Sequence, residues 1–196
     1  MGARKSGAII IVSKREASMP KGLKKLLKGA PEEDELKVLW AELAKDSTRG
    51  SVVLAVAFID DILRDTIKHR MVKLTTQEDD ELFGWSGPLA NFSARIRVAY
   101  ALGIIGRRTR HDLDAMREIR NAMAHGKRAI DFDTPEVLNI FKGLHCLRDI
   151  SDRDNYTSKR LFVTACKVMM IHLLSKMRTL PDEIEGHPRV DISSLD

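Results

Sequence analysis

Residues 49–74, RGSVVLAVAFIDDILRDTIKHRMVKL, carry the longest helical apolar pattern in this 196-residue chain. Apolar side chains recur there at intervals of three and four residues, which places them on one face of an α-helix. The apolar stripe is broad in the first half of the segment, so we expect this helix to lie at the centre of the fold. The stripe consists of Val52, Val53, Val56, Phe58, Ile59, Ile62, Leu63 and Ile67.

The same periodicity predicts further helices on both sides of the central one. Strand signals are weak, because alternation is poor and no turn pair lies between two β-branched runs. The fold class is therefore all-α, a single helical bundle of about six or seven helices. The additional helices are expected at about residues 31–45, 77–83, 89–105, 109–125, 136–147 and 158–180.

Helix boundaries follow from capping residues. We expect Gly106 to end the 89–105 helix and Gly126 to stop the following one. Thr109 is the expected cap of that following helix, with Asp112 as its capping acid at the third position. Each of these assignments uses a residue type that satisfies the free backbone groups of a helix end.

Composition indicates an ordinary globular protein, with 43% hydrophobic and 31% charged residues. No run of eighteen apolar residues occurs, so no transmembrane helix is predicted. The apolar run at residues 8–12 is too short for a signal peptide. Cys146 and Cys166 imply no disulfide framework, and we expect a reducing, cytoplasmic environment.

The charge of the chain is concentrated at its N-terminus. Residues 1–30 hold eight basic side chains and one acidic side chain, so the remaining chain is slightly acidic although the total is +5. We expect a basic flexible arm at 1–30, a helical domain at 31–181 and a tail at 182–196. The favoured role of the arm is a solubilising leader. The alternative is contact with nucleic acid phosphates or an acidic partner through Lys21, Lys24, Lys25 and Lys28.

A polar row ends the 109–125 helix. Arg117, Asn121 and His125 stand four residues apart, which places them one above another, and Arg120 lies beside them. The negative end of the helix dipole favours protonated His125. A protonated imidazole beside two guanidinium groups is unfavourable unless a nearby anion offsets the positive charges. A phosphate is one candidate for this anion.

A second source for that anion follows in the chain. Asp131 and Asp133 are close enough in sequence to meet Arg117 and the rest of the row. One interpretation is a buried polar network that fixes this helix against Ser93 and Arg95 of the preceding helix and against the 131–133 connector. The other is a binding site formed by the same groups.

The spacing Arg120-Asn121-x-x-x-His125 resembles the Arg-x4-6-His motif of HEPN-domain ribonucleases. Those proteins are all-α, usually dimeric, and cut RNA without a metal. The resemblance implies that Arg120 contacts the scissile phosphate, that His125 transfers a proton and that Asn121 orients one or both. Our alternative function is therefore a metal-independent ribonuclease, of the kind that serves as the toxin of a toxin–antitoxin pair.

A longer block, from about residue 50 to 150, contains a series of short motifs at residues 87–89, 92–96, 99–105, Leu113, Arg117, 119–121, 124–125 and 132–133. In the order and spacing of these motifs the block resembles the mannitol operon repressor (MltR) family. The resemblance implies an all-α regulator that lacks a recognisable helix-turn-helix and binds a protein partner or nucleic acid. This is the function we favour, with a homodimer and no enzyme activity, membrane or cofactor expected.

Other residues with metal-ligand chemistry have no recognised metal spacing. His145-Cys146, Cys166 and His172 form no C-x-x-C pair, and His172 lies near a stripe of Leu and Met, where a core histidine is expected. Asp60 and its neighbour Asp61 point about 100° apart on a helix, so they would not share an ion. We therefore expect no metal site.

Overall fold

The computed structural model describes residues 34, 37–38, 48–126 and 129–179. Within these residues the chain is helical and contains no strand, which confirms the all-α fold class. The arm at 1–30 with its four candidate contact lysines, the tail and most of the helix expected at 31–45 lie outside the described residues. The described helices are α3 (Thr48–Lys68), α4 (Thr76–Phe83), α5 (Phe92–Ala101), α6 (Arg107–His125), α7 (Pro135–Gly143) and α8 (Ser158–Thr179), with short 3-10 turns η1 (His145–Leu147) and η2 (Arg153–Asn155).

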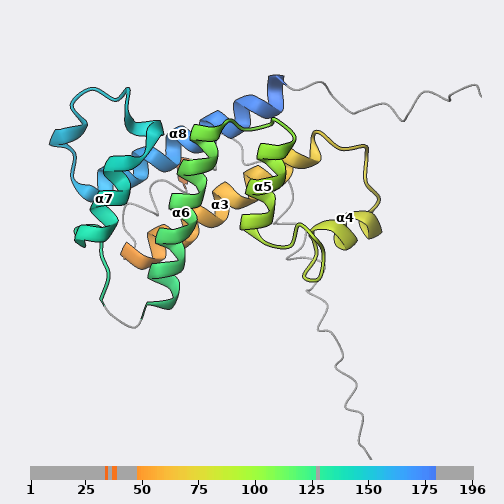
Figure 1. Ribbon diagram of the computed structural model, residues 1–196, viewed down its shortest axis with the longest axis horizontal. Helices are drawn as coiled ribbons and strands as arrows, with labels where there is room; N and C mark the ends of the chain where they lie inside the picture. The colour runs from red at the N-terminus through yellow and green to blue at the C-terminus, as the bar shows by residue number, and fades with distance from the viewer. Residues whose placement is uncertain (1–33, 35–36, 39–47, 127–128, 180–196) are drawn as a thin grey trace, which may run out of the picture.

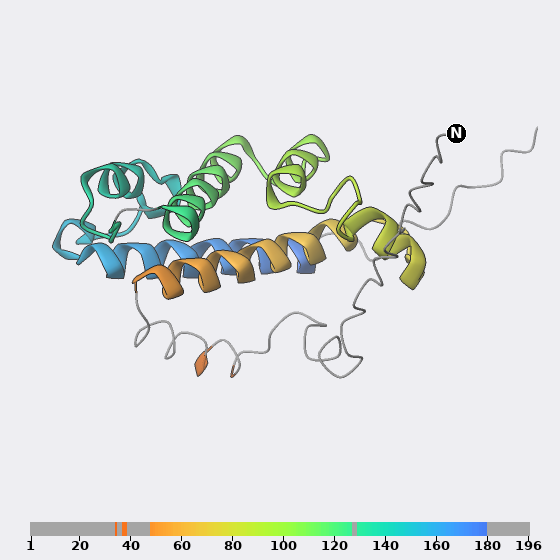
Figure 2. The same ribbon diagram turned by 90° about the horizontal axis from the view of Figure 1, so that it is seen from below.

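The helices form two layers. Helices α3 and α8 run side by side in the same direction, and α5, α6 and α7 cover one side of this pair (Figures 1 and 2). Helix α4 lies at the end of the molecule where α3 finishes (Figure 1). No helix of the described chain is long and apolar enough to cross a membrane.

Helix α3 is central, as its apolar pattern predicts. It packs against α8, α6 and α5, and its inward face is completely enclosed. Each large aliphatic side chain buried this way stabilises the fold by about 1.5–3 kcal/mol. Thr66 fits into this face because its hydroxyl donates to the carbonyl of Ile62, 2.7 Å away. The other buried α3 residues are Ser51, Val52, Ala55, Val56, Ile59, Leu63 and Ile67.

Helix α3 ends at Lys68, earlier than the predicted residue 74. The amides of Arg70 and Met71 donate to carbonyls only three residues back, which closes the helix in a tight turn. The chain then enters α4 through a capping box between Thr75 and Glu78. Asp79 of α4 forms ion pairs with Arg64 (2.6 Å) and Lys68 (2.8 Å) of α3, and these contacts position α4 against α3.

Helix α5 is shorter than the predicted 89–105. It begins at Phe92 because the Asn91 side chain accepts the amide of Ala94 and caps it. It ends at Ala101 because the chain turns at Gly103, whose φ of +69° suits a glycine. The expectation that Gly106 ends this helix is therefore wrong.

Gly106 instead stands at the start of α6. The helix begins at Arg107 with Gly106 as its cap, so the predicted cap at Thr109 is wrong. Asp112 is not a capping acid, because its buried carboxylate accepts amides from a distant segment. The predicted stop at Gly126 is confirmed: this residue ends α6, and its amide donates to the carbonyl of Ala122.

The predicted helix 136–147 is divided in two. Helix α7 stops at Gly143, Leu144 is extended, and the chain continues as η1. The Asp112 carboxylate accepts the first two amides of η1, which gives a physical reason for the break. Three rings with centroids 5.3–6.1 Å apart pack this end of the molecule against α8, and they belong to Phe132, Phe141 and Phe162.

Candidate functional site

The three residues of the ribonuclease-like motif do not form one connected group. Arg120 donates to the side-chain oxygen of Asn121 over 3.0 Å, so these two half-buried residues are joined. His125 is exposed at the last residue of α6, and among the described residues no hydrogen bond or ion pair to its side chain is present. The arrangement therefore supplies a paired Arg and Asn with a separate surface imidazole.

Arg117, the first member of the polar row, pairs within its own helix. Its guanidinium lies 3.6 Å from the Asp114 carboxylate and 3.8 Å from that of Glu118. Its Nε is enclosed and makes no hydrogen bond among the described residues. These long contacts on a partly exposed helix face contribute little to stability.

Arg95 has a different environment and links three segments. It is almost completely buried, and its Nη1 donates to Asp60 of α3 over 2.7 Å. The remaining donors reach the carbonyls of Leu89 (2.9 Å) and Ala90 (3.2 Å). A buried guanidinium with this set of partners positions the segment before α5 against α3. Arg95 therefore contacts α3 and its own preceding loop, where the sequence interpretation had placed it in a network with α6.

The pKa of the Asp60 carboxyl is affected by positive charges on two other helices, α5 and α6. Burial raises the pKa of the Asp60 carboxyl, and the neighbouring guanidinium of Arg95 opposes that rise. A smaller opposing effect on this pKa comes from Arg120 of α6. Arg120 thus acts electrostatically on α3 as well as bonding to Asn121. The pair Asp60–Asp61 does face a helix interface on one side, since Asp60 is half-buried and Asp61 is exposed.

The two aspartates after α6 bind their own surroundings. The Asp131 carboxylate accepts the amide of Asp133 and the hydroxyl of Thr134, both over 3.0 Å, and so organises the turn before α7. Asp133 accepts the hydroxyl of Ser158 over 2.6 Å, which ties this turn to the start of α8. Their described hydrogen bonds therefore serve the α7–α8 region and do not neutralise the polar row of α6.

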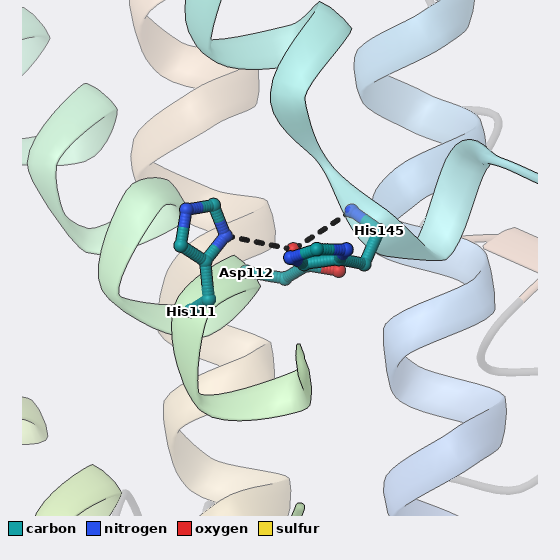
Figure 3. A group of neighbouring side chains, drawn as sticks. All are labelled: His111, Asp112 and His145. Carbon is teal, nitrogen blue, oxygen red and sulfur yellow. Dashed lines mark hydrogen bonds and ion pairs between the residues drawn. The ribbon is translucent and has the colours of Figure 1, made fainter. Parts of the chain in front are cut away.

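A second polar cluster lies where the first half of α6 meets η1, and it consists of His111, Asp112 and His145 (Figure 3). The side chain of Asp112 is only 2% exposed. Its Oδ1 accepts the backbone amide of His145 over 2.9 Å and lies 3.2 Å from Nδ1 of His111. Its Oδ2 accepts the amide of Cys146 over 2.8 Å. The carboxylate thus joins α6 to η1.

The cysteines beside this cluster are poor nucleophiles. Burial, with a further contribution from the Asp112 charge, raises the pKa of the Cys146 thiol to about 12. Burial also raises the pKa of the completely enclosed Cys166 thiol. Because the thiolate is the reactive form, cysteine-based catalysis finds no support in this region.

The sequence did not indicate the two carboxylates that join separate elements, the buried Asp112 and the half-buried Asp60. Asp112 was interpreted as a local capping acid, and Asp60 was considered only with Asp61 as a pair that would not share an ion. Their partners are 33 to 35 residues away in the chain, where no local pattern points. One feature of the sequence could have indicated them: an acidic residue lies among the apolar positions of a helix. A carboxylate buried at such a position requires a hydrogen-bond or ion-pair partner from another segment.

Comparison with known proteins identifies relatives of this scaffold. The family model described as mannitol repressor matches residues 44–168. The mannitol operon repressors of Escherichia coli strain K12 and of E. coli O6:H1 are each 25% identical over 120 residues. Those alignments cover 58% of this chain and 60% of the relative, so the match spans somewhat less than two thirds of each repressor.

A solved structure has the same fold. The X-ray structure of the MtlR–HPr complex from Escherichia coli contains a chain that matches with a TM-score of 0.54 and 22% identity. The alignment covers 72% of this chain and 96% of that one. The family model includes the whole of α3 to α7 and the first half of α8. The chain belongs to the mannitol repressor family.

Proposed function

We propose that this protein is a transcriptional regulator of the mannitol-operon-repressor type. The observation that carries the proposal is the family match over residues 44–168, which spans most of the described helical body. The two E. coli relatives are both named as repressors of the mannitol operon. A regulator of transcription works in the cytoplasm of a bacterium, and that is the location we propose.

We further propose that it acts through a protein partner. The structural neighbour was solved in complex with HPr, so HPr is the first partner to test. Trp85, in the turn between α4 and α5, offers a fully exposed aromatic side chain at 101% exposure. Tryptophan is enriched among the residues that contribute most to protein interfaces.

The turn that carries Trp85 holds this side chain on a constrained backbone. The amide of Gly87 donates to the carbonyl of Gly84 over 2.9 Å, and the amide of Leu89 donates to that of Leu82 over 2.8 Å. A Cβ on Gly87 would lie 2.4 Å from the Leu82 carbonyl oxygen, so only glycine fits this close approach. A preorganised backbone loses less entropy when a partner binds.

The test is a calorimetric titration of HPr into the full chain. We expect saturable binding that weakens at least about tenfold in Trp85→Ala, because truncation of a central interface aromatic costs about 2 kcal/mol or more. The matched control is Leu102→Ala, which removes another exposed apolar side chain, at the C-terminal end of α5. Absence of HPr binding would remove HPr as the partner, and unchanged binding by Trp85→Ala would place the contact elsewhere.

The ribonuclease alternative lacks an observation in its favour. The relatives are described as repressors, and Arg120 and His125 are not joined by a hydrogen bond in the described structure. We expect no RNA cleavage by the wild type. Cleavage by the wild type that disappears in a folded His125→Ala variant would establish the alternative and overturn our choice.

We also propose a homodimer. Its support is apolar exposure on the α3–α8 layer, where Val53 and Ile171 are large side chains open to solvent. Light scattering of the purified full chain is expected to give twice the 22.1 kDa chain mass. A monomer at micromolar concentration would contradict this. Nucleic acid binding by the arm lysines stays a proposal whose residues lie outside the described chain.

A further inference from the structure

The cluster of His111, Asp112 and His145 unites three metal-ligand side chains from two segments of the chain. His111 and Asp112 belong to α6, and His145 opens η1 (Figure 3). One ligand atom from each residue can be chosen so that all three lie within 4.8 Å of one another. The two imidazole rings meet edge to face, with centroids 4.9 Å apart.

We propose that this cluster binds a divalent transition-metal ion of the zinc type, through the two imidazoles and the Asp112 carboxylate. Imidazole nitrogen and carboxylate oxygen are both zinc ligands, and three protein ligands leave a fourth position for water. The inference is independent of the proposed regulatory function. It rests on the side-chain geometry alone.

The separations fit such an ion after a small movement. Tetrahedral zinc with bonds of about 2.0 Å places its ligand atoms about 3.3 Å apart. The His111 nitrogen and the Asp112 oxygen are already 3.2 Å apart. The remaining separations, which do not exceed 4.8 Å, would close by rotation of the two imidazoles, and the 56% exposed His111 side chain can rotate without displacing the core.

The immediate surroundings of the carboxylate favour a cation. Asp112 is buried, and among the described residues no Lys or Arg forms an ion pair with it. Two backbone amides hold its orientation, and the Cys146 thiol donates a further hydrogen bond to the carboxylate. Oδ1 also faces Nδ1 of His111, which is the position that an ion would take. In metal sites, ligating carboxylates are held in this way by hydrogen bonds from outside the coordination shell.

His145 supplies an independent indication. Its Nδ1 is enclosed and has no hydrogen-bond partner among the described residues. A buried ring nitrogen without a partner is costly, since it has lost water and gained no replacement. A rotation that brings this nitrogen onto a metal ion would satisfy it and fix the ring.

The experiment is a titration of untagged full chain with Zn²⁺ alone, followed by calorimetry and by thermal unfolding. We expect one equivalent to bind and the melting temperature to rise with Zn²⁺ concentration, because an ion that binds only the folded state stabilises it. Co²⁺ in place of Zn²⁺ is expected to develop the visible absorption of a tetrahedral site at the same stoichiometry.

Three histidine variants make the assignment specific. His111→Ala and His145→Ala should each weaken Zn²⁺ binding at least about 100-fold, more than the loss of an outer-shell group costs. His125→Ala removes an exposed imidazole from the other end of α6 and should bind as the wild type does. If His145→Ala does not fold, the exposed position of His111 keeps the test decisive.

Two results would overturn the proposal. One is the absence of a one-equivalent Zn²⁺ isotherm in the wild type. The other is equal binding by folded His111→Ala and the wild type, which would assign the ion to a different surface site. In either case the role of the cluster would be structural: the Asp112 carboxylate would connect η1 to α6 by hydrogen bonds, with the two imidazoles packed beside it.

Discussion

The two ends of helix α6 use polar residues in different ways. Near its start, Asp112 is buried and binds backbone amides of His145 and Cys146, more than thirty residues along the chain. Near its end, Arg117 pairs within its own helix, and His125 is exposed. The C-terminal end of α6, which carries the ribonuclease-like motif, makes mostly local contacts. The N-terminal end, which carries no known motif, connects α6 to a distant segment through Asp112.

This difference shows what a motif spacing can and cannot indicate. Residues four apart on a helix share a face whatever their role, so spacing identifies a row but not its partners. A buried carboxylate, by contrast, must find hydrogen-bond donors or destabilise the fold. Burial and partners separate the two ends of α6 more clearly than residue type does.

The largest effect is expected at the buried end. Asp112→Ala leaves two enclosed amides without an acceptor and should lower the free energy of unfolding by about 2–5 kcal/mol. Chemical denaturation measures this directly. The control is Asp114→Ala on the same helix, where a partly exposed carboxylate makes only long ion pairs and a change within about 0.5 kcal/mol is expected. Equal changes in the free energy of unfolding for Asp112→Ala and Asp114→Ala would contradict the structural role of Asp112.

A smaller effect is expected at the motif. Arg120→Ala removes the bond to Asn121 and a favourable charge near Asp60, and should cost about 1 kcal/mol. His125→Ala should change stability by less than about 0.5 kcal/mol, because the side chain is exposed. Thermal and chemical unfolding of both variants test this order. A loss of several kcal/mol in His125→Ala would show a structural role that its exposure does not indicate.

The smallest effect concerns pH at the contact between α6 and α8. His172 lies 3.3 Å from the Thr109 hydroxyl, and burial, assisted by the Lys176 charge, lowers its pKa below the ordinary 6.5. The unfolded state therefore binds this proton more readily, so the contribution to stability is present above pH 6.5 and is lost as pH falls through the folded-state pKa.

Substitution of His172 isolates that contribution. Stability of the wild type should decrease as pH falls below 6.5, and His172→Gln should show a shallower decrease over the same range. Unfolding measured at a series of pH values provides the comparison. Parallel curves for the two proteins would show that His172 does not titrate differently on folding.

Much of the fold was predictable because helices depend on local periodicity. The apolar stripe of α3 predicted both the helix and its central position, and Gly126 predicted the end of α6. The boundaries at Lys68 and Gly106 were missed because a tight turn and a glycine cap decided them. A repeated apolar pattern does not determine such details.

The polar contacts were less predictable than the helices. Arg95 was identified as a candidate binding residue, but its partner Asp60 lies 35 residues earlier and on another helix. The metal-ligand cluster likewise required α6 and η1 to meet, and its members have no zinc-type spacing in the sequence. Contacts of this kind depend on how all the helices pack together, and no local sequence pattern predicts them.

We propose that this protein regulates a sugar-alcohol operon, as its relatives are named to do, and that Arg120 and His125 of α6 do not form an active site. The most direct measurement is transcription from the mannitol operon in cells that lack the gene, complemented with wild type or with Arg120→Ala/His125→Ala. We predict that loss of the gene raises transcription and that both proteins restore repression. Transcription that is unchanged by the gene, or RNA cleavage that only the wild type produces, would contradict the account.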